Sequence, residues 1–126
     1  ILDGKGDTAL IIHDSIPFKQ IIFHSLSDNL QIVAAVVSDI TILSIYIPPS
    51  TIFVENEWSS FISQIRPPYM LLGDFNAHSP SWGSELTNHS GRNLLSFIDT
   101  HNLCVLNDGS PTRFTPRHLR KRAVDL

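Results

Sequence analysis

The sequence predicts a layered α/β domain rather than a helical bundle or an all-β sandwich. In the first half of the chain, short apolar runs rich in β-branched residues alternate with turn signals. In the second half, stretches with helical spacing alternate with further short apolar runs. Strands that come first and then alternate with helices are typical of a layered α/β arrangement. The length of 126 residues allows one domain at most.

The first half contains the predicted strands. Thr8–Ile12 and Phe18–Phe23 are short runs of β-branched, aromatic and other apolar residues. Leu30–Val37 and Ile40–Ile47 flank the polar pair Ser38-Asp39, a spacing that predicts a hairpin of two buried strands. The two prolines that follow end the second strand, because proline has no N–H to offer a strand ladder.

The second half contains the predicted helices. Apolar positions in Thr51–Ile65 have the spacing of an amphipathic helix, which Ser50 or Thr51 can cap and the next two prolines end. Tyr69–Leu72 is a brief apolar strand, and a long polar loop follows it. Arg92–His101 has helical spacing again, and Leu103–Leu106 is another short predicted strand.

Composition restricts the class of protein. The hydrophobic content of 42% and charged content of 17% are those of an ordinary globular protein, and the net charge of −3 provides no overall positive field for nucleic acid. A local basic patch can still bind DNA. The single cysteine, Cys104, excludes an intrachain disulfide. No signal-peptide pattern and no apolar stretch near ~20 residues is present, so we expect neither secretion nor a membrane span.

The strongest chemical signal is the segment Leu71–His78, LLGDFNAH. It predicts a buried strand that ends in a glycine turn, with the carboxylate of Asp74 and the amide of Asn76 pointing the same way. Asp74 can ligate a hard cation or position a water, and Asn76 can donate to a phosphoryl oxygen. The alternative is a Gly-Asp turn that closes a strand, with Asn76 in a left-handed conformation.

Three segments, LLGDFNAHSPSWGS, GRNLLSFIDTHNLCVLNDGSPTRFTP and AVDL, resemble the endonuclease domain of Jockey-like non-LTR retrotransposons. These domains belong to the endonuclease/exonuclease/phosphatase superfamily, with deoxyribonuclease I and the apurinic/apyrimidinic endonucleases. The combination of GDFNAH with PTRF is specific, whereas GDFN alone is not. The resemblance implies a sandwich of two facing mixed β-sheets flanked by helices. Residues 1–126 are then a single partial domain that lacks the N- and C-terminal strands.

The resemblance also implies roles for individual residues. Asp74 matches the aspartate that activates or orients the attacking water and contributes to the metal site, and Asn76 matches the asparagine that binds the scissile phosphate. Tyr46 matches a tyrosine near that phosphate, Thr112 a threonine that supports the active site, and Asp125 an aspartate that orients the catalytic histidine. Considered alone, Tyr46 is a strand-capping residue, Thr112 a turn residue and Asp125 a polar residue at a strand end.

A basic concentration near the C-terminus is the candidate DNA contact. Arg113 and Arg117 are expected to bind the DNA substrate together with Asn76 and Thr112. The full concentration comprises Arg113, Arg117, Arg120, Lys121 and Arg122. Such a patch can neutralise phosphates, and it can equally be a solvated loop. His78 is expected to be either solvated or hydrogen-bonded locally rather than catalytic, and Trp82 is expected to pack rather than to stack on a base.

The implied activity is that of a DNA endonuclease dependent on Mg²⁺ or Mn²⁺. It would nick target DNA for a linked reverse transcriptase, in the nucleus or otherwise in the cytoplasm. The family's principal metal-binding glutamate and its catalytic histidine are missing from residues 1–126, so the isolated chain is expected to be inactive and marginally stable. The alternatives are a small-molecule or lipid phosphoesterase of the same superfamily, which the PTRF and NAHSPSWGS segments disfavour, and an inactive transposon relic.

Overall fold

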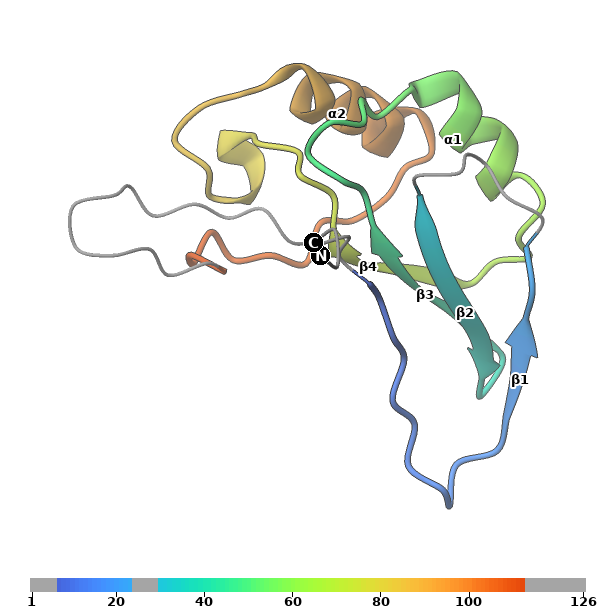
Figure 1. Cartoon of the computed structure of the whole chain (residues 1–126). Coiled ribbons are helices and arrows are strands. Elements are labelled where there is room, and N and C mark those ends of the chain that lie inside the picture. The colour runs from blue at the N-terminus through green and yellow to red at the C-terminus, as the bar shows by residue number, and fades with distance from the viewer. Residues whose placement is uncertain (1–6, 24–29, 113–126) are drawn as a thin grey trace, which may run out of the picture.

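The computed structural model of the chain describes residues 7–23 and 30–112. These residues form a mixed four-stranded sheet in the order β1-β2-β3-β4, with two α-helices and a short 3-10 helix. Both α-helices lie on one side of the sheet (Figure 1). The elements are β1 (Phe18–Ile21), β2 (Gln31–Val37), β3 (Ile40–Tyr46), α1 (Glu55–Ile62), β4 (Tyr69–Asp74), η1 (Pro80–Trp82) and α2 (His89–Thr100). The α/β class predicted from the sequence is therefore confirmed.

The predicted hairpin is confirmed. β2 and β3 pair antiparallel, with Val37 opposite Ile40 across the turn. Ser38 and Asp39 have φ angles of 49° and 65°, the left-handed values that a type I′ hairpin turn of two residues requires at both central positions. β1 adds antiparallel to β2, and β4 adds parallel to β3 after the chain has crossed through α1.

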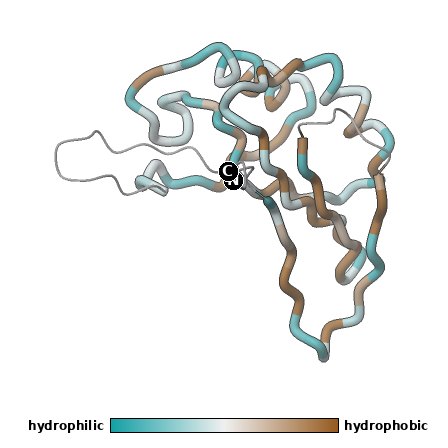
Figure 2. The backbone as a smooth tube through the Cα atoms, viewed as in Figure 1, coloured by the Kyte–Doolittle hydropathy of each residue, from teal (hydrophilic) through white to brown (hydrophobic). Residues whose placement is uncertain are grey.

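An aromatic cluster joins the helices to the sheet. Phe53 stacks on Trp58 with 4.9 Å between ring centroids, and it meets Phe97 edge-on at 5.5 Å. Leu43 and Ile45 of β3 are fully buried beneath these rings. Figure 2 shows predominantly hydrophobic stretches along β2 and β3, and also along the segment that precedes β1. Aromatic packing of this kind contributes beyond the area that it buries, so this side of the sheet is where most of the stability resides.

The opposite side of the sheet is also apolar but far less covered. Phe18 is 58% exposed, and Met70 and Leu72 are each 37% exposed. The segment of residues 7–13 lies along part of this side, where Thr8 and Ser44 are joined by a hydrogen bond between their hydroxyl groups. The apolar run Thr8–Ile12 within this segment is not a strand.

The first helix is shorter than the spacing predicted. It begins at Glu55 rather than Thr51, and neither Ser50 nor Thr51 caps it. Contacts with α2 are the reason. The Phe53 N–H donates to Ser90 Oγ at 3.2 Å, and Asn93 Nδ2 donates to the Phe53 carbonyl at 2.7 Å. These bonds tie Phe53 to α2, and the next residue, Val54, has an extended backbone where the local pattern favours a helix.

The strand predicted at Leu103–Leu106 is wrong. Leu103 and Val105 are half-buried while Cys104 and Leu106 are exposed, which is the alternation of a strand. A strand also needs a ladder of backbone hydrogen bonds to a neighbour. Within residues 7–23 and 30–112, no strand pairs with this segment.

Candidate functional site

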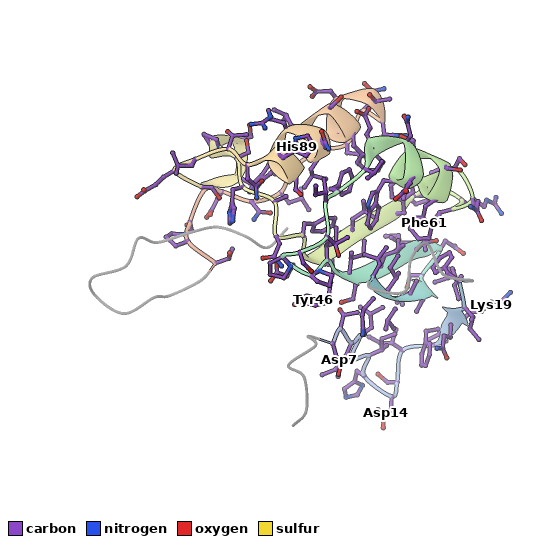
Figure 3. All side chains as sticks on the ribbon, turned by 45° about the horizontal axis from the view of Figure 1, so that its top comes forward. Asp7, Asp14, Lys19, Tyr46, Phe61 and His89 are labelled. Atoms are coloured by element: carbon purple, nitrogen blue, oxygen red, sulfur yellow. The ribbon has the colours of Figure 1, made fainter. Side chains whose placement is uncertain are left out.

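The candidate site lies where β3 and β4 end. Because these strands are parallel, their carboxyl ends meet at the same edge of the sheet. Tyr46 and Asp74 are direct partners in the register, so their side chains leave the sheet on the same side, the side opposite the helices. The Ile47 N–H donates to the Asp74 carbonyl at 2.8 Å and extends the pairing. Figure 3 shows Tyr46 at this end of the sheet, away from Lys19 on β1 and from Phe61 on α1.

The residues on either side of Asp74 explain how the sequence fixes its position. Gly73 has a φ of 135°, and a β-carbon there would overlap the carbonyl of Ile45. Only glycine lets β3 and β4 approach so closely at this point. Phe75 is 1% exposed and lies 6.1 Å from Trp58 between ring centroids. The core therefore anchors the chain through Phe75, directly beside the carboxylate of Asp74.

Asn76 is held by two hydrogen bonds. Its N–H donates to Asp74 Oδ1 at 2.9 Å, and its Nδ2 donates to the Ile47 carbonyl at 2.7 Å. Its φ of 46° is left-handed, which asparagine tolerates better than most residues. The turn predicted as the alternative to a site is thus present. It coexists with a site, because the amide nitrogen carries two hydrogens and a second one is left to donate.

The loop after Asn76 is well packed. Trp82 is fully buried and its Nε1 donates to the Ala77 carbonyl at 2.9 Å, which confirms that it packs in the interior. The His78 Nδ1 lies 3.5 Å from Ser84 Oγ, which confirms the expected local hydrogen bonding. Sequence reasoning missed Asn88, whose side chain joins this loop to α2. An asparagine just before a helical stretch is a capping signal that would have identified it.

The other predicted site residues lie farther along the chain. Thr112 is exposed and is the last described residue. Near it, the Ser110 N–H donates to Asp108 Oδ1 at 2.8 Å, and this hydrogen bond lowers the pKa of Asp108 below its usual value. The basic residues and the last aspartate, namely Arg113, Arg117, Arg120, Lys121, Arg122 and Asp125, lie outside the described residues. The structure thus brings together Tyr46, Asp74 and Asn76.

The donors present fit a hard divalent cation in kind but not in number. A carboxylate oxygen such as that of Asp74 is a ligand that Mg²⁺ prefers, and Mg²⁺ is usually held by one or two carboxylates, waters and substrate oxygens. In the part of the chain that the structure describes, no three histidine, cysteine, aspartate or glutamate side chains come together as a metal-binding group. Asp74 can supply one ligand of such a site, and further ligands must come from elsewhere.

No helix in residues 7–23 and 30–112 is both long enough and apolar enough to cross a membrane.

Comparisons with known proteins find a family match and similarity to proteins of mobile elements. Residues 40–126 match the family described as endonuclease-reverse transcriptase. The chain is 32% identical over 88 residues to a probable RNA-directed DNA polymerase from transposon BS of Drosophila melanogaster, covering 68% of the chain and 10% of that protein. It is 25% identical over 122 residues to the RNA-directed DNA polymerase from mobile element jockey of the same organism, covering 90% of the chain and 13% of that protein. The chain therefore spans only about a tenth of the length of these relatives.

A solved structure shares the fold. The endonuclease domain of TRAS1, a telomere-specific non-LTR retrotransposon, superposes with a TM-score of 0.71. The match covers 91% of the chain and 56% of that structure, at 23% sequence identity. At this identity the likeness shows that the two share a fold.

Proposed function

Since this chain belongs to the endonuclease-reverse transcriptase family, we propose that it forms part of a domain that nicks DNA for retrotransposition. Membership confirms the resemblance based on the GDFNAH and PTRF segments. One observation carries the proposal: Tyr46 and Asp74 are neighbours on one side of the sheet, and Asn76 is fixed directly beside them. A hydroxyl, a carboxylate and an amide at one strand edge are suited to hold a phosphodiester and a water.

The proposed reaction is hydrolysis of one phosphodiester bond. The oxygen of a water molecule forms a bond to phosphorus, and the bond from phosphorus to the 3′ oxygen breaks. One water proton ends on the departing oxygen, so the products are a 3′-hydroxyl and a 5′-phosphate. Asp74 orients the water by accepting a hydrogen bond from it. Asn76 donates its second N–H to a non-bridging phosphoryl oxygen, where negative charge increases during the reaction.

Tyr46 completes the described part of the site. Its hydroxyl lies on the same side of the sheet as Asp74, one strand away. A phenol at this position can donate to the phosphate or to the attacking water. In this proposal Tyr46 keeps the role that the family resemblance implies.

We assign Mg²⁺, or Mn²⁺, as the cofactor of the same site. Asp74 would hold it together with a glutamate that lies outside residues 1–126. When bound, the cation neutralises negative charge on the phosphate.

The DNA partner is proposed to lie over the same edge of the sheet. Thr112, Arg113 and Arg117 would contact the phosphate backbone, and Asp125 would orient a histidine from outside residues 1–126. The exposed 3′-hydroxyl is the end that a linked reverse transcriptase extends. The parent protein would therefore act in the nucleus, or otherwise in the cytoplasm.

The exposed apolar side of the sheet supports the proposal that a second sheet faces it in the parent protein. Exposed positions such as Met70 and Leu72 lie next to each other on this side and give it an apolar character unusual for a solvated surface. We propose that the parent protein covers this side with a facing β-sheet, as the family resemblance implies. The result would be the two-sheet sandwich with helices outside.

The test is nicking of supercoiled plasmid DNA by the protein that carries this chain with its flanking sequence, in the presence of Mg²⁺. Asp74→Asn keeps the acceptor for the Asn76 N–H but removes the charge, so the nicking rate should fall at least about a hundredfold. Asp99→Asn, an exposed carboxylate on α2, is the matched control and should nick at the wild-type rate.

Three outcomes would change the proposal. Nicking by Asp74→Asn at the wild-type rate would remove Asp74 from the reaction. Hydrolysis of inositol or sphingolipid phosphates in preference to DNA would reassign the substrate class. A wild-type protein that folds and cleaves none of these substrates would be an inactive relic.

A further inference from the structure

Asn88 is the residue that connects the candidate site to the second helix. It lies immediately before α2 in the chain, and its side chain reaches back to the loop that follows Asp74. Its Oδ1 accepts from the Gly91 N–H at 2.7 Å and from the His78 N–H at 2.9 Å. Its Nδ2 donates to the Asn76 carbonyl at 3.1 Å. Its backbone N–H donates to the His78 carbonyl at 3.2 Å.

Helix capping explains only one of these four bonds. An N-cap side chain needs an acceptor for a backbone N–H in the first turn, which the bond to Gly91 provides. Serine, threonine or aspartate would perform this task equally well. The bond to the Asn76 carbonyl requires a donor in addition, and the side-chain amide of asparagine supplies a donor and an acceptor together.

Gly91 allows the helix and the loop to come this close. A β-carbon at Gly91 would overlap the His78 carbonyl. The first turn of α2 is therefore in direct backbone contact with the loop, and Asn88 bridges the remaining gap. On the other side of the loop, Trp82 holds the Ala77 carbonyl. Three successive carbonyls of the loop therefore accept hydrogen bonds. Asn88 donates to the carbonyls of Asn76 and His78, and Trp82 donates to that of Ala77.

The hydrogen bonds that join Asn88 to Asn76 and His78 form a clamp on the loop. This clamp restricts the conformation of Asn76. Asn76 has a left-handed φ of 46°. The direction of its carbonyl depends on the next backbone rotation, ψ, about the bond from Cα to the carbonyl carbon. A bond that fixes this carbonyl also fixes the Cα from which the Asn76 side chain leaves. The side-chain amide can then keep its contact with the Ile47 carbonyl and present its second hydrogen in one direction.

We propose that Asn88 is a positioning residue for Asn76, distinct from its role as a helix cap. The inference rests on the proposed endonuclease function for its catalytic consequence, though the geometry of the clamp does not depend on it. Asn88 need not touch DNA. It acts by holding the backbone of Asn76 so that the amide meets the phosphate in a preset orientation.

The substitution Asn88→Asp separates the two roles. Aspartate keeps the acceptor for Gly91 and His78, and it caps helices as well as asparagine does. It replaces the donor to the Asn76 carbonyl by an oxygen, which repels that carbonyl. Asn88→Ser is the second variant, because serine also caps a helix but is too short to bridge to Asn76. Asn88→Ala removes both roles and serves as the reference for full loss.

Three readouts apply to the whole protein that carries this chain. For Asn88→Asp we expect a thermal midpoint near that of the wild type. The Asn76 N–H donates to Asp74 within the turn that the clamp holds, so a looser turn should open this bond more often. We therefore expect backbone amide exchange at Asn76, measured by hydrogen–deuterium exchange mass spectrometry, to become about five to ten times faster. We expect kcat for plasmid nicking to fall about 10- to 100-fold while KM changes little. If Asn88 were only a helix cap, Asn88→Asp would keep the wild-type thermal midpoint, exchange rate and kcat, and only Asn88→Ala, which removes the cap, would lower the thermal midpoint.

The outcomes separate this inference from the proposed function. If Asn88→Asp and Asn88→Ser both keep wild-type exchange at Asn76, the positioning role is overturned whatever the activity. If exchange rises but the wild-type protein cleaves no DNA, the positioning role stands and the proposed function fails. If Asn88→Asp does not fold, Asn88→Ser decides the question by the same two measurements.

Discussion

The two sides of the central sheet both carry apolar side chains, but they differ in how far these are buried. On the side facing the helices, Leu43 and Ile45 are fully buried under an aromatic cluster. On the other side, Met70 and Leu72 remain 37% exposed, although they are equally apolar. Apolar composition alone therefore does not tell which side of a strand is packed. The same difference separates the proposed chemistry from the core packing, because Asp74 lies on the exposed side and Phe75 on the packed one.

The four residues from Gly73 to Asn76 show how one short segment serves both sides. Successive side chains of a strand point to opposite sides of the sheet. Phe75 is thereby directed into the core, and the carboxylate of Asp74 is left beside Tyr46. A residue that stabilises the core and a residue of the candidate site are therefore adjacent in sequence but lie on opposite sides of the sheet. Substitutions at neighbouring positions should thus have different kinds of effect.

The largest effect on stability is expected at Phe75. Phe75→Ala removes a ring that is 1% exposed and leaves a cavity beside Trp58, so the free energy of unfolding should fall by about 3–5 kcal/mol. Urea denaturation followed by circular dichroism measures this change. In the chain of 126 residues Phe18→Ala is the matched control, since Phe18 is 58% exposed, and its change should stay within about 0.5 kcal/mol. Equal losses in the two variants would mean that the sides of the sheet do not differ as described.

The second prediction concerns the exposed side and depends on its proposed second sheet. In the chain of 126 residues, Met70→Ser should change the free energy of unfolding by no more than about 0.5 kcal/mol, because Met70 is on the surface. In the longer parent protein the same substitution should cost about 1–3 kcal/mol, because it would bury a hydroxyl under the second sheet. Urea denaturation of both proteins gives the comparison. A negligible change in the longer protein would show that this side stays exposed there.

The smallest effect is expected at the start of β4. Burial raises the pKa of Tyr69, which lies on the packed side of the sheet. Because the folded-state pKa is above that of the unfolded chain, the stabilising contribution is fully present below about pH 10 and is lost as the pH rises through the folded value. Tyr69→Phe should make the alkaline decline in thermal midpoint shallower. An identical decline in both proteins would show that Tyr69 does not contribute to it.

Much of the fold and part of the site follow from local signals in the sequence. The pair Ser38-Asp39 between two apolar runs was enough to predict the hairpin, because a two-residue turn fixes its own register. The strand that ends at Gly73-Asp74 was predicted from its apolar run and glycine turn. The segments around GDFNAH and PTRF were enough to predict the family. Each of these signals depends on neighbours in the chain, and a sequence displays such neighbours directly.

What the tertiary structure decided depends on partners distant in the chain. α1 begins at Glu55 because two hydrogen bonds tie Phe53 to α2, and Leu103–Leu106 stays outside the sheet because no described strand pairs with it. Asn88 was missed because the helix was predicted to begin at Arg92, whereas α2 begins at His89, and only the folded chain brings the Asn88 amide to the carbonyl of Asn76. A backbone hydrogen bond has no sequence signature of its own, since every residue carries the same N–H and carbonyl. Which of them meet is therefore settled only when the layers pack.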